Sequence, residues 1–206
     1  MSRPAARPLP IPSTAQLELE LPCRIGLVSD THGWLDPKLL EHFTGLDAIL
    51  HAGDIGDPAI LTALAALAPT VAVRGNIDGG RLLDLPLAAL VDLGRPRRLR
   101  IALLHIAGNP ARPSRDARAL LERARPNLLV VGHSHIAVAG RVGALTWINP
   151  GAAGHHGIHD ERSAFLLEVD AEGGLQLGRI DLGPRGRGQR RSGLRRAEGP
   201  EGSSPE

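Results

Sequence analysis

Five short clusters of polar residues carry the groups in this sequence that could do chemistry. They are Asp30-Thr31-His32, His51-Ala52-Gly53-Asp54, Gly75-Asn76-Ile77-Asp78, His105 and Gly132-His133-Ser134-His135. Carboxylate, imidazole and amide groups are ligand types that suit Mn, Fe, Zn and related divalent ions. The clusters therefore indicate a metal site, provided that the fold brings them together.

The spacing within the clusters supports this interpretation. In an extended chain, residues two apart point to the same side, so Asp30 with His32, and His133 with His135, can reach into one cleft. Three of the clusters also contain a glycine, which permits tight or positive-φ turns next to a ligand: Gly53, Gly75 and Gly132.

Simpler explanations exist for single members of the set. A lone histidine at a strand end, such as His105, is often a buried imidazole with satisfied hydrogen bonds. Asp54 after a glycine could start a turn, and Asn76 could form an Asx-turn. The metal interpretation depends on all the clusters meeting at one place.

The elements that would position these clusters follow from the hydrophobic pattern. Short apolar runs at 24–29, 48–51 and 71–74 read as buried strands, and each is followed by a cluster. Asp36-Pro37 and Asp57-Pro58 each mark a helix start, with an N-cap followed by Pro at the first helical position. This strand and helix order predicts a parallel sheet with functional loops at the carboxyl ends of its strands.

The second part of the chain has a different rhythm. Residues 87–93 and 99–105 read as a hairpin, and Ser114 caps a further helix. After that helix only strands are expected, at 128–131, 136–142, 145–148, 164–169 and 175–180. We expect these later strands to form another sheet.

Composition bounds the domain organisation. A chain of 206 residues with 42% hydrophobic residues is typical of one globular domain. We expect this domain at residues 23–183, after a Pro-rich disordered extension at 1–22 and before a disordered Arg/Gly-rich tail at 184–206. The single cysteine, Cys23, excludes an internal disulfide and any Cys-based metal cluster.

Composition also limits location and partners. We find no signal-peptide pattern and no apolar stretch of membrane-spanning length, so we expect a cytoplasmic protein without a membrane partner. Residues 184–206 hold six Arg and three Glu, so the basic character belongs to the tail. Such a tail can contact nucleic acid weakly, but it lacks interleaved aromatic residues, and we do not expect a nucleic-acid binding function.

In this order, the clusters resemble the signature of the calcineurin-like metallophosphoesterases: D-x-H, G-D, G-N, H and G-H-x-H. The resemblance runs from about Ile25 to Ile180, and Asn149-Pro150-Gly151 is a further match. It is greatest to the small bacterial and archaeal phosphodiesterase branch that also includes the retromer scaffold subunit.

The resemblance implies a fold, a cofactor and a reaction. The fold is a four-layer α/β/β/α sandwich of two mixed sheets flanked by helices. The cofactor is a pair of divalent ions, with Mn²⁺ favoured over Fe, Zn, Ni or Co, and a metal-bridging hydroxide attacks the phosphorus atom. By matching motifs, one metal is held by Asp30, His32, Asp54 and His135, and the other by Asp54, Asn76, His105 and His133.

The sequence departs from the wider family at two positions. Ile77 stands where many members have a histidine that assists the leaving group, which favours substrates that need no such acid. Ile106 follows His105 in place of the usual glycine, so the loop behind that ligand is expected to be displaced.

Other polar residues near the clusters have less defined roles. Asn76 and Arg74 are candidates for substrate binding, and His51 and Asp78 are candidates for orienting ligands. The loop histidines His155, His156 and His159 either contact substrate or metal, or are simply exposed.

The predicted function is therefore hydrolysis of small phosphodiesters or activated phosphomonoesters by a metal-dependent phosphoesterase. A protein-interaction scaffold on the same fold, with weak or no catalysis, is the alternative. Its discriminating feature is the ligand set, because a pure scaffold is free to lose ligating side chains. The sequence leaves the oligomeric state open, a homo-oligomer included.

Overall fold

The computed structural model describes residues 9–157 and 159–185. Its helices are α1 (Pro37–Phe43), α2 (Pro58–Ala65), the 3₁₀ helix η1 (Gly80–Asp84) and α3 (Arg115–Ala124). Its strands are β1 (Leu17–Leu19), β2 (Cys23–Val28), β3 (Ala48–His51), β4 (Thr70–Ala72), β5 (Ala88–Leu93), β6 (Leu99–Leu104), β7 (Gly108–Asn109), β8 (Arg112–Pro113), β9 (Leu128–Val131), β10 (Ala137–Val142), β11 (Leu145–Pro150), β12 (Glu161–Val169) and β13 (Leu175–Pro184). Within the described ranges, none of the helices has the length and apolar character needed to span a bilayer.

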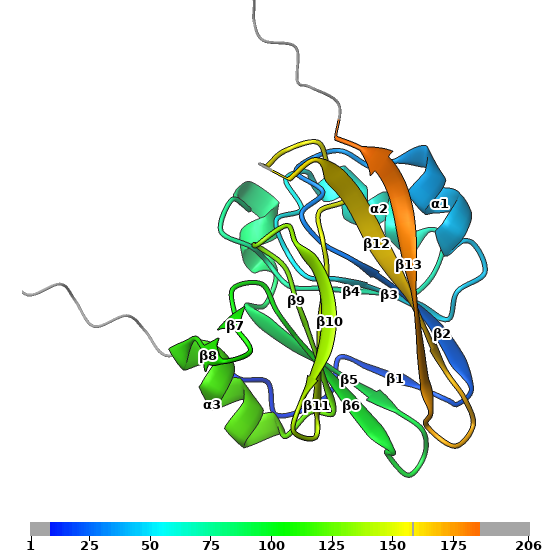
Figure 1. The fold of residues 1–206 in the computed structure, drawn as a ribbon, viewed down its shortest axis with the longest axis vertical. Coiled ribbons are helices and arrows are strands. Elements are labelled where there is room, and N and C mark those ends of the chain that lie inside the picture. Colours follow the sequence, from blue (N-terminus) through cyan, green and yellow to red (C-terminus); the bar gives the residue numbers. More distant parts are fainter. Residues whose placement is uncertain (1–8, 158, 186–206) are drawn as a thin grey trace, which may run out of the picture.

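The strands form two large mixed sheets (Figure 1). One has the order β1-β5-β6-β9-β11-β10, and the other has the order β13-β12-β2-β3-β4. In the second sheet β2, β3 and β4 are parallel, as the strand and helix order predicts. In the first sheet β6 is parallel to β9, so both strands end at the same edge.

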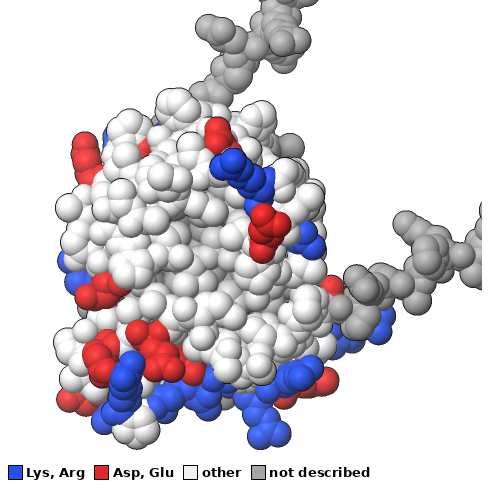
Figure 2. Space-filling view, turned by 180° about the vertical axis from the view of Figure 1, so that it is seen from behind, with Lys and Arg blue, Asp and Glu red and all other residues white. Residues whose placement is uncertain are grey.

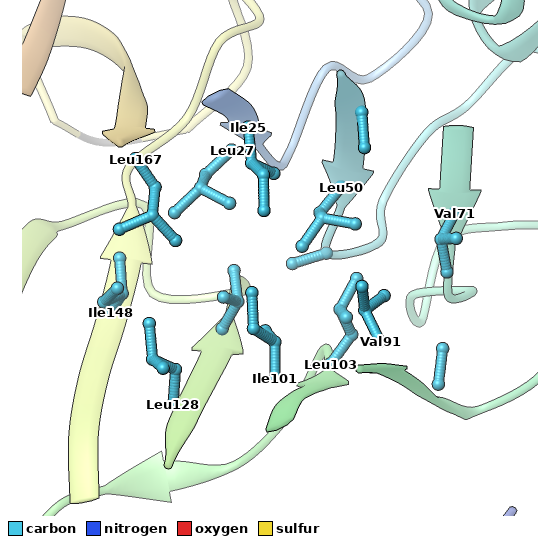
Figure 3. Close-up of a cluster of buried hydrophobic side chains, with 14 of the residues drawn as sticks. Ile25, Leu27, Leu50, Val71, Val91, Ile101, Leu103, Leu128, Ile148 and Leu167 are labelled. Carbon is cyan, nitrogen blue, oxygen red and sulfur yellow. The ribbon is translucent and has the colours of Figure 1, made fainter. Parts of the chain in front are cut away.

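The two sheets pack face to face around an aliphatic core. Figure 3 shows Ile25, Leu27 and Leu50 of one sheet pointing toward Ile101 and Leu103 of the other, and all five are fully buried. A second cluster of buried side chains lies between the sheet of β2 and helices α1 and α2, and a third lies between the sheet of β6 and α3. This layering confirms the predicted four-layer α/β/β/α sandwich of two mixed sheets.

The predicted helix starts are present. Asp36 and Asp57 cap α1 and α2 by accepting hydrogen bonds from Lys38 N and Ala59 N, and a proline follows each cap. Ser114 caps α3 by accepting a hydrogen bond from Ala117 N. These caps satisfy backbone N–H groups that a helix start leaves unpaired.

The structure corrects two expectations about organisation. Part of the predicted disordered extension is ordered, because Leu17–Leu19 pairs in parallel with β5 and Leu9 is buried against the α3 layer. The later strands also do not all form one sheet: β5, β6, β9, β10 and β11 share a sheet with β1, but β12 and β13 join the first strands of the domain through the pairing of β12 with β2. Residues 1–8 and most of the predicted tail, from 186 on, lie outside the described residues.

Candidate metal centre

All seven predicted ligands lie in loops at one edge of the two sheets. Asp30 and His32 follow β2, Asp54 follows β3 and Asn76 follows β4, while His105 follows β6 and His133 and His135 follow β9. The strands that deliver them run parallel within each sheet, so their carboxyl ends meet at the same edge. The tertiary structure thus brings together side chains more than a hundred positions apart.

One group consists of Asp30, His32, Asp54 and His135, and we call it the His135 side. Its candidate ligand atoms all lie within 4.8 Å of one another. His135 Nε2 is 3.2 Å from Asp30 Oδ1 and 3.3 Å from His32 Nε2. Four ligand atoms this close can bind a single ion.

The other group consists of Asp54, Asn76, His105 and His133, and we call it the His105 side. The carboxylate and the two imidazoles again have ligand atoms within 4.8 Å of one another. His105 Nε2 lies 3.2 Å from Asp54 Oδ1 and 3.2 Å from Asn76 Oδ1. Asp54 belongs to both groups, one oxygen facing His105 and the other lying 3.9 Å from His32 Nε2.

The backbone at the site is strained. Five of the seven residues have a positive φ: Asp30 (54°), His32 (49°), Asp54 (54°), His133 (69°) and His135 (60°). In the described part of the chain, only one other non-glycine residue, Arg125, shares this property. A left-handed conformation costs a non-glycine residue about 1–3 kcal/mol, and such strain concentrates at functional sites.

The glycines next to the candidate ligands matter mainly because they have no side chain, and less because they allow left-handed turns. Gly53 has a φ of 92°, but Gly75 and Gly132 do not have a left-handed backbone. A Cβ on Gly75 would overlap Asp54 Oδ1 and Asp54 N, and a Cβ on Gly132 would lie 2.8 Å from Ala52 O. The loops can approach one another this closely only without side chains at these positions.

His51 and Asp78 hold the loops in place. His51 Nδ1 accepts a hydrogen bond from Gly53 N (3.2 Å), and its Nε2 lies 3.0 Å from Thr31 Oγ1. Asp78 accepts hydrogen bonds from Gly75 N (2.7 Å) and Gly56 N (2.8 Å). Both side chains thus contact the loop backbone or a neighbouring hydroxyl.

Asn149 is a positioning residue whose contact was not anticipated from the sequence. Its Nδ2 donates to Gly132 O and to Ser134 Oγ, both at 2.9 Å, and so supports the loop that carries His133 and His135. The Asn149-Pro150-Gly151 motif was visible as a family match, but the motif by itself does not say which loop the amide contacts.

The site concentrates negative charge in the protein interior. Asp30 is fully buried and Asp54 nearly so, and neither pairs with an Arg or Lys of the described chain. Burial opposes ionisation of Asp54, but the hydrogen bond and positive charge of His105 outweigh it and lower the Asp54 pKa. Burial likewise opposes protonation of His105, but Asp54 and Asp30 outweigh it and raise the His105 pKa. A proton on His105 thus balances the Asp54 carboxylate, which a divalent ion can neutralise instead.

This donor set fits two divalent cations. It combines two buried carboxylates, four imidazoles and one amide in two tight groups that share one carboxylate. Nitrogen and oxygen ligands of this kind suit Mn, Fe, Zn, Ni and Co alike. The geometry does not distinguish among these metals.

The other residues predicted to lie near the site, Arg74 and the loop histidines, have different contacts. Arg74 donates from Nη1 to Leu83 O (3.0 Å) and also lines a cavity beside Asn76. The His156 ring lies 5.4 Å from that of His32, and the His155 ring lies 4.8 Å from Trp34. His159 lines a separate cavity beside His135.

Arg185 is a residue at the site that sequence reasoning assigned to the tail. Its backbone N donates to Asp160 O (2.6 Å), and its Nη1 donates to His156 O. The space that a Cβ on Gly157 would need is filled by Arg185 Nη1 and His135 Nδ1, so the guanidinium borders the His135 side. Within the described residues, Arg185 Nε and Nη2 are the only buried side-chain polar atoms without a hydrogen-bond partner.

Both departures from the family pattern lie on the His105 side. Ile77 donates its backbone N–H to Asp54 Oδ1 (3.1 Å), while its side chain remains 46% exposed. His105 still reaches the cluster although Ile106 follows it, because its Nδ1 lies 2.7 Å from Ala52 O, which fixes the ring.

Comparison with known proteins identifies related sequences and folds. A model of the calcineurin-like phosphoesterase superfamily domain matches residues 23–172. A probable metallophosphoesterase of Methanothermobacter thermautotrophicus is 29% identical over 153 residues, which cover 72% of this chain and 87% of that protein.

Two solved structures share the fold. One is an archaeal phosphodiesterase, with a TM-score of 0.60, 21% identity, and coverage of 76% of this chain and 99% of that one. The other is Vps29 of Entamoeba histolytica in complex with Zn²⁺, with a TM-score of 0.59, 21% identity, and coverage of 77% and 99%.

Proposed function

The chain belongs to the calcineurin-like phosphoesterase superfamily, and from that premise we propose that it hydrolyses phosphodiesters or activated phosphomonoesters with two divalent ions. One observation carries the proposal: two groups of ligating side chains meet at one sheet edge and share Asp54. A shared carboxylate sets two ions close enough together to act on one phosphoryl group.

The seven ligands divide as the motifs imply. Asp30, His32, Asp54 and His135 would hold one ion, and Asp54, Asn76, His105 and His133 the other. Two ions held there would supply Lewis acidity, which would make water more acidic and offset charge on the phosphoryl oxygens. We propose Mn²⁺ as the native metal, with Fe, Zn, Ni and Co as alternatives.

The chain's own residues would orient the substrate. The Asn76 amide lies at the edge of the His105 side and can donate from Nδ2 to a phosphoryl oxygen. Arg185 offers unpaired N–H groups beside His135, which suit an anionic oxygen. Both contacts would hold the phosphorus centre against the cluster of ligands.

Ile77 narrows the substrate class. An aliphatic side chain cannot donate a proton to the departing oxygen. We therefore propose that preferred substrates carry a good leaving group, and that small phosphodiesters are favoured over unactivated phosphomonoesters. The absence of any Cys pair in the chain suits a reducing cytoplasm, where we place the protein.

A protein-interaction scaffold is the second candidate function. The observation in its favour is the fold shared with Vps29, which belongs to the scaffold branch that the sequence resembles. Against it stands the ligand set, because each predicted position retains a side chain that can bind metal and all seven meet at one edge. A scaffold with weak catalysis would bind metal without turning over substrate at a useful rate.

Metal analysis combined with hydrolysis of bis(para-nitrophenyl) phosphate tests the proposal. We expect two ions per wild-type chain, and we expect Asp54→Asn to reduce both metal content and turnover, the latter at least ~100-fold. Asp57→Asn is the matched control, because Asn also caps α2 and the residue lies outside the ligand set. Equal turnover by Asp54→Asn and wild type would exclude this catalytic site.

A further inference from the structure

Exposed isoleucines flank the His105 side. Ile77 directly follows Asn76 and is 46% exposed, and Ile106 directly follows His105 and is 43% exposed.

A cavity opens beside Ile106, which lines it. It has a volume of about 210 Å³ and is continuous with the metal-ligand candidates Asn76 and His105. Its apolar walls come from three segments of the chain: Leu9 before β1, Leu87 before β5, and Leu104 and Ile106 at the end of β6. Two charged residues, Arg74 and Asp116, complete the lining.

We propose that this cavity binds the organic group of the phosphoester, and that this group is an aromatic ring. The inference rests on the proposed function, because the phosphoryl group must sit at the ligands for its ester group to reach the cavity. The volume of about 210 Å³ suits one ring system. Arg74 can stack on the face of such a ring while its Nη1 stays bonded to Leu83 O.

The position of the cavity distinguishes it from the other hollows of the surface. A larger cavity of about 550 Å³ is lined by Cys23, Arg24 and Asp47, which lie at the starts of β2 and β3. The ligands follow the opposite ends of those strands, so a group bound there cannot be attached to a phosphorus atom at the metal centre. Of these two cavities, only the one at Ile106 combines apolar walls with His105.

Binding of two phosphonates to the metal-loaded full-length protein tests the proposal without relying on turnover. Phenylphosphonate and methylphosphonate present the same anionic group and differ in the ring. We expect calorimetry to show phenylphosphonate binding about tenfold more tightly, because only the ring can bury apolar surface in the cavity.

Substitutions at Ile106 localise the ring. Ile106→Ser should reduce the preference to about threefold or less, and Ile106→Trp should fill the cavity and weaken phenylphosphonate alone. Ile106 is 43% exposed and lies outside the buried core, so neither change should impair folding. Ile136→Ser is the matched control: Ile136 also follows a candidate ligand directly and is 50% exposed, but it lies on the His135 side.

Each outcome has a defined meaning. Equal binding of both phosphonates to the wild type, or loss of the preference in Ile136→Ser but not in Ile106→Ser, would overturn the assignment of the cavity and leave the metal centre standing. Failure of both phosphonates to bind a protein that contains two ions would overturn the cavity and the proposed function together. A preference that disappears only in the two Ile106 variants would support the cavity.

Discussion

The two sides of the metal centre share Asp54 but have different surroundings. The His135 side is bordered by His156 and by the guanidinium of Arg185, both rich in hydrogen-bond donors. The His105 side is bordered by an apolar cavity, whereas exposed isoleucines adjoin both sides: Ile77 and Ile106 here, and Ile136 next to His135. We propose that the cavity on the His105 side takes the organic group, while donors on both sides, Asn76 and Arg185, contact the anionic oxygens.

Removing one imidazole from each side should have the largest effect. His135→Ala should lower metal content from two ions per chain toward one and reduce turnover at least ~100-fold, because His135 Nε2 adjoins both Asp30 and His32. His133 belongs to the His105 side, so His133→Ala should leave the ion of the His135 side in place. Metal analysis and hydrolysis assays measure both effects, and unchanged metal content in His135→Ala would remove that residue from the ligand set.

A substitution that crowds the shared carboxylate of Asp54 should have the second-largest effect. Gly75→Ala should lower the free energy of unfolding by about 1–3 kcal/mol and weaken metal binding, because the new methyl group overlaps Asp54 Oδ1 and Asp54 N. Gly79→Ala, in the same loop, is the control, because a Cβ there has nothing within 4 Å. Denaturant unfolding with metal analysis separates the two, and equal stability of both variants would show that the loop can relax.

The pH dependence of folding stability tests the role of His51, which holds the loops that carry the ligands. Complete burial lowers its pKa from 6.5 to about 4. Between those values the unfolded chain binds a proton that the folded chain does not, so stability is full above pH 6.5 and falls on acidification by up to about 1.4 kcal/mol per pH unit.

Urea unfolding at pH 7 and pH 5, with a chelator present, measures this effect. The His51→Gln variant should lose about 2 kcal/mol less than the wild type over this interval, because its side chain does not titrate. Parallel losses in the two proteins would show that the ring is solvated in the folded state.

Replacing the arginine of the His135 side should have the smallest effect. Arg185→Gln should raise KM for a phosphodiester roughly three- to tenfold and change kcat little, because it removes donors to the anion and leaves the ligands intact. Arg95→Gln is the control. Arg95 lies in the turn after β5, at the opposite end of the sheet from His105, and it pairs with Glu18 and Glu20. A KM that is the same in both variants would place Arg185 outside substrate binding.

The control residue Arg95 lies in a region that is rich in charged side chains. Figure 2 shows that charged side chains of both signs gather along the lower end of the molecule, while much of the face above is uncharged. The turn between β5 and β6 lies at that lower end in Figure 1. Exposed ion pairs of this kind contribute little to stability, about 0–1 kcal/mol each.

Local pattern was enough to predict most of the elements. β3 and β9 begin and end where the apolar runs predict, and both Asp-Pro pairs start helices. These features depend on neighbouring residues alone, through side-chain alternation and capping hydrogen bonds. For the same reason the candidate ligands could be found, since each directly follows a strand that its own residues specify.

Pairing between distant segments could not be predicted in this way. Side-chain alternation shows which face of a strand is buried but not which sheet the strand joins, so β12 was assigned to the wrong sheet. The contact of Leu9 with the α3 layer and the position of Arg185 beside His135 also depend on long-range packing.

The sequence alone thus determined the types of ligand and their places at the strand ends. Only the tertiary structure decided that Asp54 faces both His32 and His105, that glycines make room for this contact, and that a cavity adjoins one side only. The physical reason is that a side chain's chemistry is local, whereas the distance between two loops is set by how whole sheets pack.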